Sequence, residues 1–406
     1  MKKEKNANEA KGDVMSGKRQ ELRTLYAETI PYLLQWYEYN RRILPWREEP
    51  TPYHVWVSEI MLQQTRVEAV KGYYDRFLTR LPDVKALANA EEEVLLKLWE
   101  GLGYYNRVRN MQKAAKILVE QYGGEMPADY EAIRALPGIG DYTAGAVSSI
   151  AFSLPYPAVD GNVLRVMSRI ACNEEDIAKE QTKKKLKEDL TSVMPKESGD
   201  FNQALMELGA TVCLPNGKPL CEQCPVMHLC KAFHEGKEMQ LPVKSGKKER
   251  RIEHRKVYVL SCGEKVVLHR REGKGLLAGL WEFPNRLITE ETEQDNFEGT
   301  IVRTQKAKHI FSHVEWHMEG IWIQADGGEN GTPGPEELEE RLLKTAQYLT
   351  ERELKQEISR EDWVVASFSE LQEKYPIPSA FEAFLKELRK GDNVCESGQD
   401  MMYIGW

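Results

Sequence analysis

The sequence predicts a multidomain protein in which a mainly α-helical N-terminal part is followed by a smaller α+β domain. Three observations support this fold class. Apolar residues recur at helical intervals from Glu21 onward, and four of the seven cysteines then lie within residues 213–230. A charged stretch at 231–256 separates those cysteines from segments with strand character. We therefore expect a tail at 1–20, a helical domain at 21–230, a linker at 231–256, an α+β domain at 257–390 and a C-terminal tail at 391–406.

Composition narrows the class of protein. The chain has 406 residues and 41% hydrophobic content, enough to bury proper cores in more than one domain. Its formal net charge of −8 argues weakly against a nucleic-acid partner, but the acidic excess lies in the C-terminal part, so the N-terminal part is still able to carry a basic face. No apolar run approaches the ~18 residues of a membrane span. We expect a cytoplasmic protein with no membrane partner, and we interpret the Lys-rich residues 1–20 as a disordered tail.

The second predicted helix places a carboxylate among apolar residues. A first helical stretch ends at Leu44-Pro45-Trp46-Arg47, and the next one contains Glu59 in the middle of its apolar positions. A carboxylate in such a position needs a reason. The pattern alone is explained equally well by a side chain that turns to solvent on an amphipathic helix.

A glycine-bent loop follows the helical pattern that ends near Leu98. Gly101 and Gly103 break this helix, and Tyr104 and Arg107 come directly after the break. Exposed aromatic rings with arginines on such a loop are able to stack on bases and to hold phosphates. Packing in a core is nevertheless the commoner fate of a tyrosine.

Residues 136–144 read L-P-G-I-G-D-Y-T-A, which is typical of a hairpin between two helices. Pro137 ends the first helix, whereas Gly138 and Gly140 allow positive φ and leave backbone N–H groups bare at the start of the second. Bare N–H groups at the positive end of a helix dipole form an anion site that suits phosphate. The alternative is a plain helix–helix corner.

Asp160 lies in an apolar-flanked turn before another helical pattern, where an aspartate is usually an N-cap. A glycine hairpin followed about 20 residues later by such an aspartate, after a helix of small residues, resembles the helix-hairpin-helix DNA glycosylase superfamily. Tyr142 stands where bifunctional members such as endonuclease III carry a Schiff-base lysine. Tyrosine at this position looks like the adenine-specific MutY branch.

The string from Pro45 to Thr65 is similar to the opening of MutY proteins. This resemblance implies that Glu59 is the catalytic acid and that Asp160 is an ionised carboxylate that stabilises the sugar, with Tyr142 and Asn162 as positioning residues. Gln64 and Tyr104 are implied to fill the gap left by an extruded nucleotide. The implied DNA-binding residues are Arg47, Gln63, Gln64, Tyr104, Arg107, Gly138 and Gly140.

The cysteines of the helical part form a C-x₇-C-x₂-C-x₅-C pattern. Four thiolates in one loop-rich segment are able to hold either four irons or a single zinc. The pattern is too compact for a two-knuckle zinc ribbon. It resembles the [4Fe–4S] loop of endonuclease III and MutY, although six residues usually separate the first two cysteines there. We expect a structural [4Fe–4S] cluster, with zinc as the alternative, held by Cys213, Cys221, Cys224 and Cys230.

The C-terminal part begins with two strand-like segments, 257–260 and 265–269, around a Cys262-Gly263 turn. Residues 275–284 then resemble the Nudix-fold domain appended to MutY. Nudix enzymes place several glutamates on one helix after this motif to bind Mg²⁺, but residues 286–300 have no R-E-x-x-E-E arrangement. We therefore expect a domain that binds without hydrolysing, with a final helix over 379–390.

Residues 309–317 are strand-like and contain Phe311, Ser312 and His313. Taken alone, these three are ordinary strand residues. Because a Nudix-like domain without its metal site needs another function, we expect them to recognise 8-oxoguanine, which differs from guanine at N7 and C8.

The resemblance covers roughly residues 21–390. It implies a monomeric base-excision-repair enzyme that flips adenine, mispaired with 8-oxoguanine or guanine, out of duplex DNA and cleaves its N-glycosidic bond. One alternative is an endonuclease III-like pyrimidine glycosylase with lyase activity, which Tyr142 disfavours. The other is a non-enzymatic DNA-damage-binding protein, which the joint presence of Glu59 and Asp160 disfavours.

Overall fold

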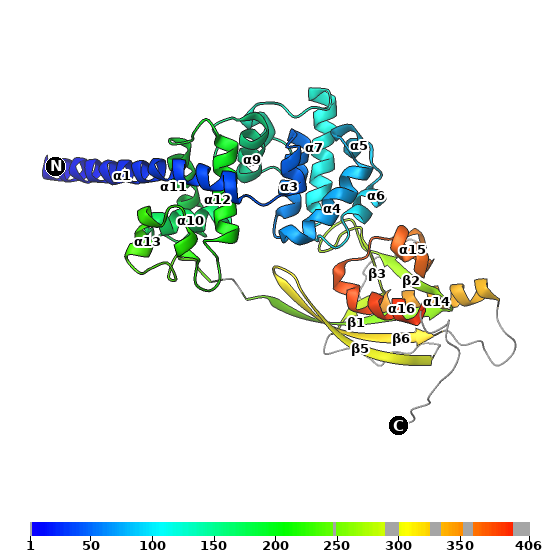
Figure 1. The fold of residues 1–406 in the computed structure, drawn as a ribbon. Coiled ribbons are helices and arrows are strands. Elements are labelled where there is room, and N and C mark those ends of the chain that lie inside the picture. Colours follow the sequence, from blue (N-terminus) through cyan, green and yellow to red (C-terminus); the bar gives the residue numbers. More distant parts are fainter. Residues whose placement is uncertain (1, 247–248, 289–299, 325–333, 352–359, 393–406) are drawn as a thin grey trace. The chain divides into compact units, whose positions relative to one another are not determined.

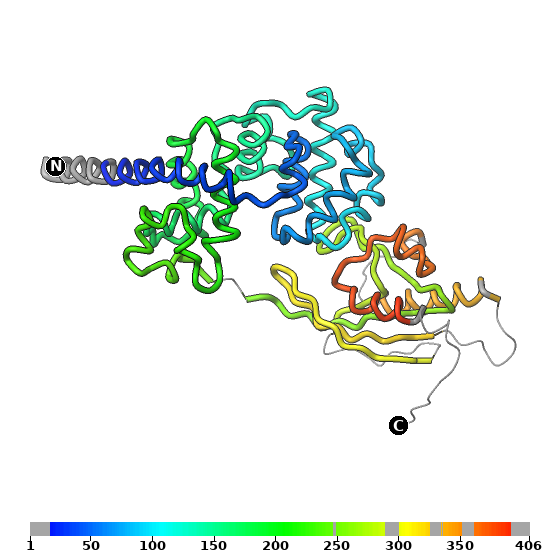
Figure 2. The backbone as a smooth tube through the Cα atoms, viewed as in Figure 1, coloured from blue at the N-terminus to red at the C-terminus, as the bar shows by residue number. Residues whose placement is uncertain are grey.

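The computed structural model describes residues 2–246, 249–288, 300–324, 334–351 and 360–392 (Figures 1 and 2). The chain divides into two compact units. The first comprises residues 1–90 and 107–246, and the second comprises 91–106 and 247–406.

The first unit is helical. Its elements in chain order are α1 (Lys2–Asn40), α2 (Pro45–Glu48), α3 (Pro52–Leu62), α4 (Val67–Arg80), α5 (Val84–Asn89), α7 (Asn106–Tyr122), α8 (Tyr130–Arg134), α9 (Asp141–Phe152), α10 (Gly161–Ala171), α11 (Glu180–Thr191), α12 (Ser198–Thr211), the 3₁₀ turns η1 (Cys221–Gln223) and η2 (Met227–Leu229), and α13 (Lys231–His234).

Helix α1 begins at Lys2, within the stretch that we predicted to be a disordered tail. Arg19 donates hydrogen bonds to Glu188 and Asp189 of α11, at 2.7 and 2.6 Å. This stretch has few apolar residues and many charged ones, which is why its composition predicts disorder. Its Lys, Glu and Ala residues are nevertheless good helix formers, and helix propensity does not depend on burial.

Two helical glycines let the elements of the first unit approach closely. A Cβ on Gly145 of α9 would lie 2.3 Å from the carbonyl oxygen of Pro157. A Cβ on Gly209 of α12 would lie 2.6 Å from the Cβ of Asn162. The segment around Asp160 is therefore pressed between α9 and α12, which fixes where the start of α10 lies.

The described residues of the second unit form a seven-stranded mixed sheet. The strand order is β3-β2-β1-β6-β5, with β4 also paired to β1 and β7 to β2, and among these described strands only β1 and β6 pair in parallel. Its elements are α6 (Glu92–Leu98), β1 (Arg251–Cys262), β2 (Lys265–Arg270), β3 (Trp281–Glu282), β4 (Asn285–Leu287), β5 (Thr300–Ile310), β6 (Val314–Gln324), α14 (Pro335–Glu351), η3 (Arg360–Asp362), β7 (Trp363–Ser367), α15 (Phe368–Glu373), η4 (Ser379–Phe381) and α16 (Glu382–Asp392).

Alternate side chains of β1 pack into two hydrophobic cores, one on each face of the sheet. Val257 and Val259 pack with Phe381 and Phe384 of η4 and α16, whereas Tyr258 and Leu260 pack in a second cluster with residues of α14. This is the period-2 pattern of a strand that is covered on both faces.

The predicted strands at 257–260 and 265–269 are confirmed, as is the turn between them, where Gly263 has φ +55°. The final helix is also confirmed, with a 3₁₀ start at 379–381. Strand β1 begins at Arg251, inside the predicted linker at 231–256, because β6 pairs with it from that residue on. Residues 289–299 of the stretch without Nudix glutamates, the 325–333 loop and the tail from 393 lie outside the described residues.

Residues 311–313 form the turn between β5 and β6, not part of a strand. None of the described helices is long and apolar enough to cross a membrane.

Candidate active site

The two predicted catalytic carboxylates line one cleft of about 530 Å³ in the first unit. Glu59 comes from the middle of α3, and Asp160 directly precedes α10. Tyr142 and Asn162 line the same cleft, together with Gln63, Gln64 and Arg47. The structure therefore brings together seven of the residues that the sequence singles out.

Glu59 is buried, with 6% of its surface exposed, so the alternative of a solvent-facing glutamate is excluded. Burial raises the pKa of Glu59 to about 7, the negative charge of Asp160 acts in the same direction, and the hydroxyl of Tyr142 opposes both by donating a hydrogen bond to Oε2. A carboxyl with this pKa is about half protonated at neutral pH.

Asp160 is both an N-cap and a cleft residue. Its Oδ1 accepts the backbone N–H of Val163 at 2.8 Å, and its Oδ2 accepts Nδ2 of Asn162 at 2.7 Å. Burial raises the pKa of Asp160, while these hydrogen bonds act in the opposite direction. The amide of Asn162 is oriented by Arg165, whose Nη2 donates to Oδ1 at 2.9 Å.

The C-terminal end of α3 is held from α7. Arg107 Nη1 donates to the carbonyl oxygens of Ile60 at 2.8 Å and of Gln63 at 2.7 Å. The next residue, Gln64, has φ +60°, a strained value for a non-glycine residue. Arg107, which we predicted to bind DNA, thus supports the backbone that carries Gln63 and Gln64.

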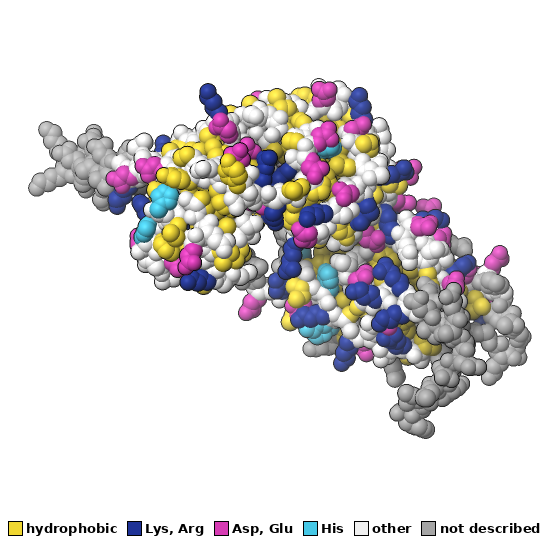
Figure 3. Space-filling view, in the orientation of Figure 1, with side chains coloured by type: hydrophobic (Ala, Val, Ile, Leu, Met, Phe, Trp, Pro, Cys, Tyr) yellow, Lys and Arg dark blue, Asp and Glu magenta, His cyan; other side chains and the backbone are white. Residues whose placement is uncertain are grey.

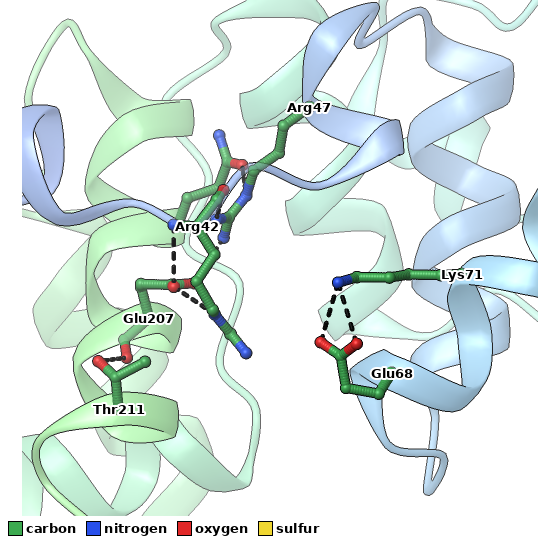
Figure 4. A network of polar contacts seen from close by, with 7 residues as sticks. Arg42, Arg47, Glu68, Lys71, Glu207 and Thr211 are labelled. Atoms are coloured by element: carbon green, nitrogen blue, oxygen red, sulfur yellow. Dashed lines mark hydrogen bonds and ion pairs between the residues drawn. The ribbon is translucent and has the colours of Figure 1, made fainter.

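Arg47 lies in an ion-pair network that the sequence reading missed (Figure 4). Glu207 of α12 is 1% exposed and bonds to Arg42 Nε at 2.5 Å and to Arg47 Nη2 at 2.8 Å. Burial acts to raise the pKa of Glu207, but the two guanidinium groups outweigh it and hold this pKa below its ordinary value. Glu207 carries the same signal as Glu59, a carboxylate inside an apolar helical pattern.

The predicted hairpin joins α8 to α9. Gly138 has φ +78°, and a Cβ there would lie 2.6 Å from Asn110. Gly140, which would also allow positive φ, has φ −96° as the N-cap of α9, and a Cβ there would meet no described atom within 4 Å. No described side chain caps α9. The N–H groups of its first turn thus remain open to a ligand.

Tyr104 belongs to the second unit, in the loop that follows α6. Gly101, Gly103 and Tyr104 all have positive φ, and 48% of the tyrosine surface is exposed. The expected break in the helix is confirmed, and core packing of Tyr104 is excluded.

Comparison with known proteins places this cleft in a family. A family model described as HhH-GPD superfamily base excision DNA repair protein matches residues 57–192, and one described as a NUDIX domain matches residues 256–387. The adenine DNA glycosylase of Mus musculus is 36% identical over 375 residues, which span 75% of this chain and 72% of that protein. The adenine DNA glycosylase of Buchnera aphidicola subsp. Baizongia pistaciae is 36% identical over 300 residues, spanning 72% of this chain and 84% of that protein.

The chain belongs to the adenine DNA glycosylase family. The solved structure of a thermostable thymine-DNA glycosylase is also similar, at 29% identity over 53% of this chain and 98% of that chain, with a TM-score of 0.47.

The four cysteines of this adenine DNA glycosylase family member surround one cavity at the end of α10. Cys213, Cys221, Cys224 and Cys230 all line it, and their thiols are not paired as disulfides. Arg169 Nη1 donates to the sulfur of Cys213 at 3.2 Å. Among the described residues, no three His, Cys, Asp or Glu side chains lie close enough to hold a single metal ion.

The turn after β5 presents Ser312 and His313 to solvent. The Phe311 ring lies 4.9 Å from the buried Trp316 ring, which anchors the turn to the core. Ser312 Oγ and His313 Nδ1 are 3.1 Å apart. Several Lys and Arg side chains lie on the face of the second unit that Figure 3 shows.

Proposed function

We propose that the chain removes adenine mispaired with 8-oxoguanine or guanine from duplex DNA by hydrolysing the N-glycosidic bond, as a step of base excision repair. The observation that carries this proposal is the meeting of Glu59, Tyr142 and Asp160 in one cleft. The enzyme acts as a cytoplasmic monomer in this proposal.

Glu59 is the general acid. Its pKa of about 7 lets it hold a proton at neutral pH and transfer that proton to the departing adenine. Protonation turns adenine into a neutral leaving group, and the low-polarity position of Glu59 on α3 is what keeps the carboxyl available for this role.

Asp160 is the carboxylate that stabilises the positive charge on the sugar. Burial raises its pKa, but its two oxygens accept hydrogen bonds from Val163 and Asn162 at the start of α10, and these bonds favour the ionised form. A retaining glycosidase divides the work between two carboxylates in the same way. Tyr142 holds Glu59, and it supplies no amine for a Schiff base, which supports a monofunctional enzyme.

DNA is held from several elements. The open N–H groups at the start of α9 suit a phosphate, and the open space at Gly140 admits one. The strained backbone at Gln64 and at Tyr104 suits residues that replace an extruded nucleotide in the stack. Gln63 and Arg47 line the cleft into which the adenine turns.

Cys213, Cys221, Cys224 and Cys230 hold a [4Fe–4S] cluster. The fit is supported by the four thiols that line one cavity, which matches the four cysteine ligands of a four-iron cubane. When bound, the cluster supplies a structural cross-link within residues 213–230.

Phe311, Ser312 and His313 recognise 8-oxoguanine opposite the adenine. A hydroxyl and an imidazole on an exposed turn are suited to hydrogen bonding at N7 and O8, where the lesion differs from guanine. One or two such bonds provide roughly 1–3 kcal/mol of discrimination, or about ten- to a hundred-fold in rate.

Single-turnover excision on an A:8-oxoguanine duplex, analysed with and without alkali, tests this function. We expect abasic sites that become strand breaks only in alkali, and no borohydride-trapped imine. The Asp160→Asn protein is the matched control, because asparagine caps a helix about as well and only the charge is lost. It should bind the duplex and lose most excision. Strand breakage without alkali would favour the lyase alternative, and binding without excision by the parent protein would favour the damage-binding alternative.

A further inference from the structure

The turn at residues 311–313 is held from the start of β1. Strand β1 runs parallel to β6, and Arg251 lies opposite Val314, the first residue after the turn. The chain entering β1 therefore passes beside the turn, although about sixty residues separate the two in sequence.

Two hydrogen bonds connect this entering chain to the carbonyl oxygens of the turn. Arg250 Nε donates to the carbonyl of Phe311 at 3.1 Å. The backbone N–H of Arg251 donates to the carbonyl of His313 at 3.2 Å. Together with the bond from the Phe311 N–H to the carbonyl of Val314 at 2.8 Å, they fix the peptide planes before and after Phe311 and the one after His313.

We propose that Arg250 is a specificity-determining positioning residue, which holds the Phe311–His313 turn in the conformation that reads 8-oxoguanine. The inference rests on the proposed role of Ser312 and His313. Because these side chains are exposed, their orientation depends on how firmly the backbone of the turn is held. Loss of one of the two hydrogen bonds from residues 250 and 251 therefore lets the turn sample other orientations. This loss weakens the contact of the turn with 8-oxoguanine and leaves the cleft that contains Glu59 and Asp160 unchanged.

The chain offers a matched control at the next residue. Arg251 holds the turn through its backbone, while its side chain is 74% exposed and pairs with Glu253. Arg251→Ala therefore removes the same charge from the same surface but keeps the hydrogen bond to His313.

Two further variants separate hydrogen bonding from charge. Glutamine places its Nε2 at the same distance along the side chain as arginine Nε, so Arg250→Gln keeps the donor and loses the charge. Lysine has a methylene there, so Arg250→Lys keeps the charge and loses the donor at that position.

The experiment measures single-turnover excision on A:8-oxoguanine and A:G duplexes for these three variants, for Arg250→Ala and for the parent. We expect Arg250→Ala and Arg250→Lys to lower the ratio of the two rates by about three- to tenfold with the A:G rate unchanged, as loss of about one hydrogen bond implies. Arg250→Gln and Arg251→Ala should keep the ratio within twofold. Amide hydrogen exchange over residues 309–316 should quicken only in the first two variants.

Equal effects of Arg250→Ala and Arg251→Ala, an equal loss on both duplexes, or an unchanged ratio in Arg250→Ala would overturn the proposal. The Ser312→Ala/His313→Ala protein is measured alongside. If the ratio of the two excision rates falls in the Ser312→Ala/His313→Ala protein but not in Arg250→Ala, only the role of Arg250 is contradicted. If the ratio of the Ser312→Ala/His313→Ala protein equals that of the parent, the proposed recognition of 8-oxoguanine by the turn is contradicted.

Discussion

At the residue scale, Glu59 and Asp160 differ in their hydrogen-bond partners. Glu59 accepts from Tyr142 alone among the described side chains, while Asp160 accepts from Val163 and Asn162 at the start of a helix. The sequence indicated that Glu59 and Asp160 matter, but pattern alone left their burial open. Which carboxyl keeps its proton depends on contacts between α3, α9 and α10, which local periodicity does not contain.

Replacement of Glu59 by glutamine should stabilise the protein at neutral and alkaline pH while removing excision. The Glu59 carboxyl takes up a proton below about pH 7 in the folded state but only below about 4.5 when unfolded. The stability that it contributes is therefore present at pH 4 and is lost as pH rises through 7, by at most about 3 kcal/mol. Glutamine has no charged form, so Glu59→Gln escapes this loss.

Thermal unfolding of Glu59→Gln and the parent from pH 5 to pH 8.5 measures the effect. The difference in melting temperature should grow as pH rises, with Glu235→Gln, an exposed change of the same kind, as the control. A difference that is constant across this range would contradict a raised pKa at Glu59.

At the element scale, the α8–α9 hairpin uses its two glycines for different purposes. Gly138 is required by the backbone, because φ is +78° and Asn110 occupies the space of a Cβ. Neither the backbone angle nor the surrounding space requires a glycine at 140, because φ is −96° and no described atom lies within 4 Å of a Cβ there. The sequence predicted the hairpin and two glycines that allow positive φ, but not which of them adopts it, since it shows residue types and not the dihedral angles that the neighbouring helices impose.

This difference gives a paired prediction. Gly138→Ala should destabilise the fold by about 1–3 kcal/mol through strain and the clash with Asn110. Gly140→Ala should leave the melting temperature within a degree or two but weaken binding to an undamaged duplex several-fold, because its methyl group fills the space of a phosphate. Normal duplex affinity in Gly140→Ala, measured by fluorescence anisotropy at fixed salt, would exclude a phosphate site at α9.

At the scale of the whole molecule, the sequence predicted the order of parts well and their boundaries less well. Helical periodicity, the cysteine cluster and the strand-like segments each depend on local spacing, and the structure places them in the expected order. The start of β1 at Arg251 depends on pairing with β6, and the turn at 311–313 depends on where that hairpin reverses. Tertiary pairing of this kind leaves no signal in a local pattern.

The proposed cluster predicts the metal content of the purified protein and the stability of its first unit. We expect a brown protein with about four irons and four sulfides per chain, as a cubane requires, and a lower melting temperature after the iron is removed, because the cysteine segment packs on α10 and α12. Elemental analysis with labile-sulfide determination checks this. One zinc per chain in a colourless, active preparation would identify the alternative metal.

Helix α10 lies between the cleft that contains Asp160 and the cavity lined by the four cysteines. Arg165 donates to the amide of Asn162, which holds Asp160, and also to the carbonyl of Cys213, both at 2.9 Å. One guanidinium thus belongs to the environment of Asp160 and to that of the cysteine cavity. We therefore expect a double-mutant cycle between Asn162 and Arg165 to give a coupling energy different from zero, because Arg165 donates directly to the Asn162 amide oxygen.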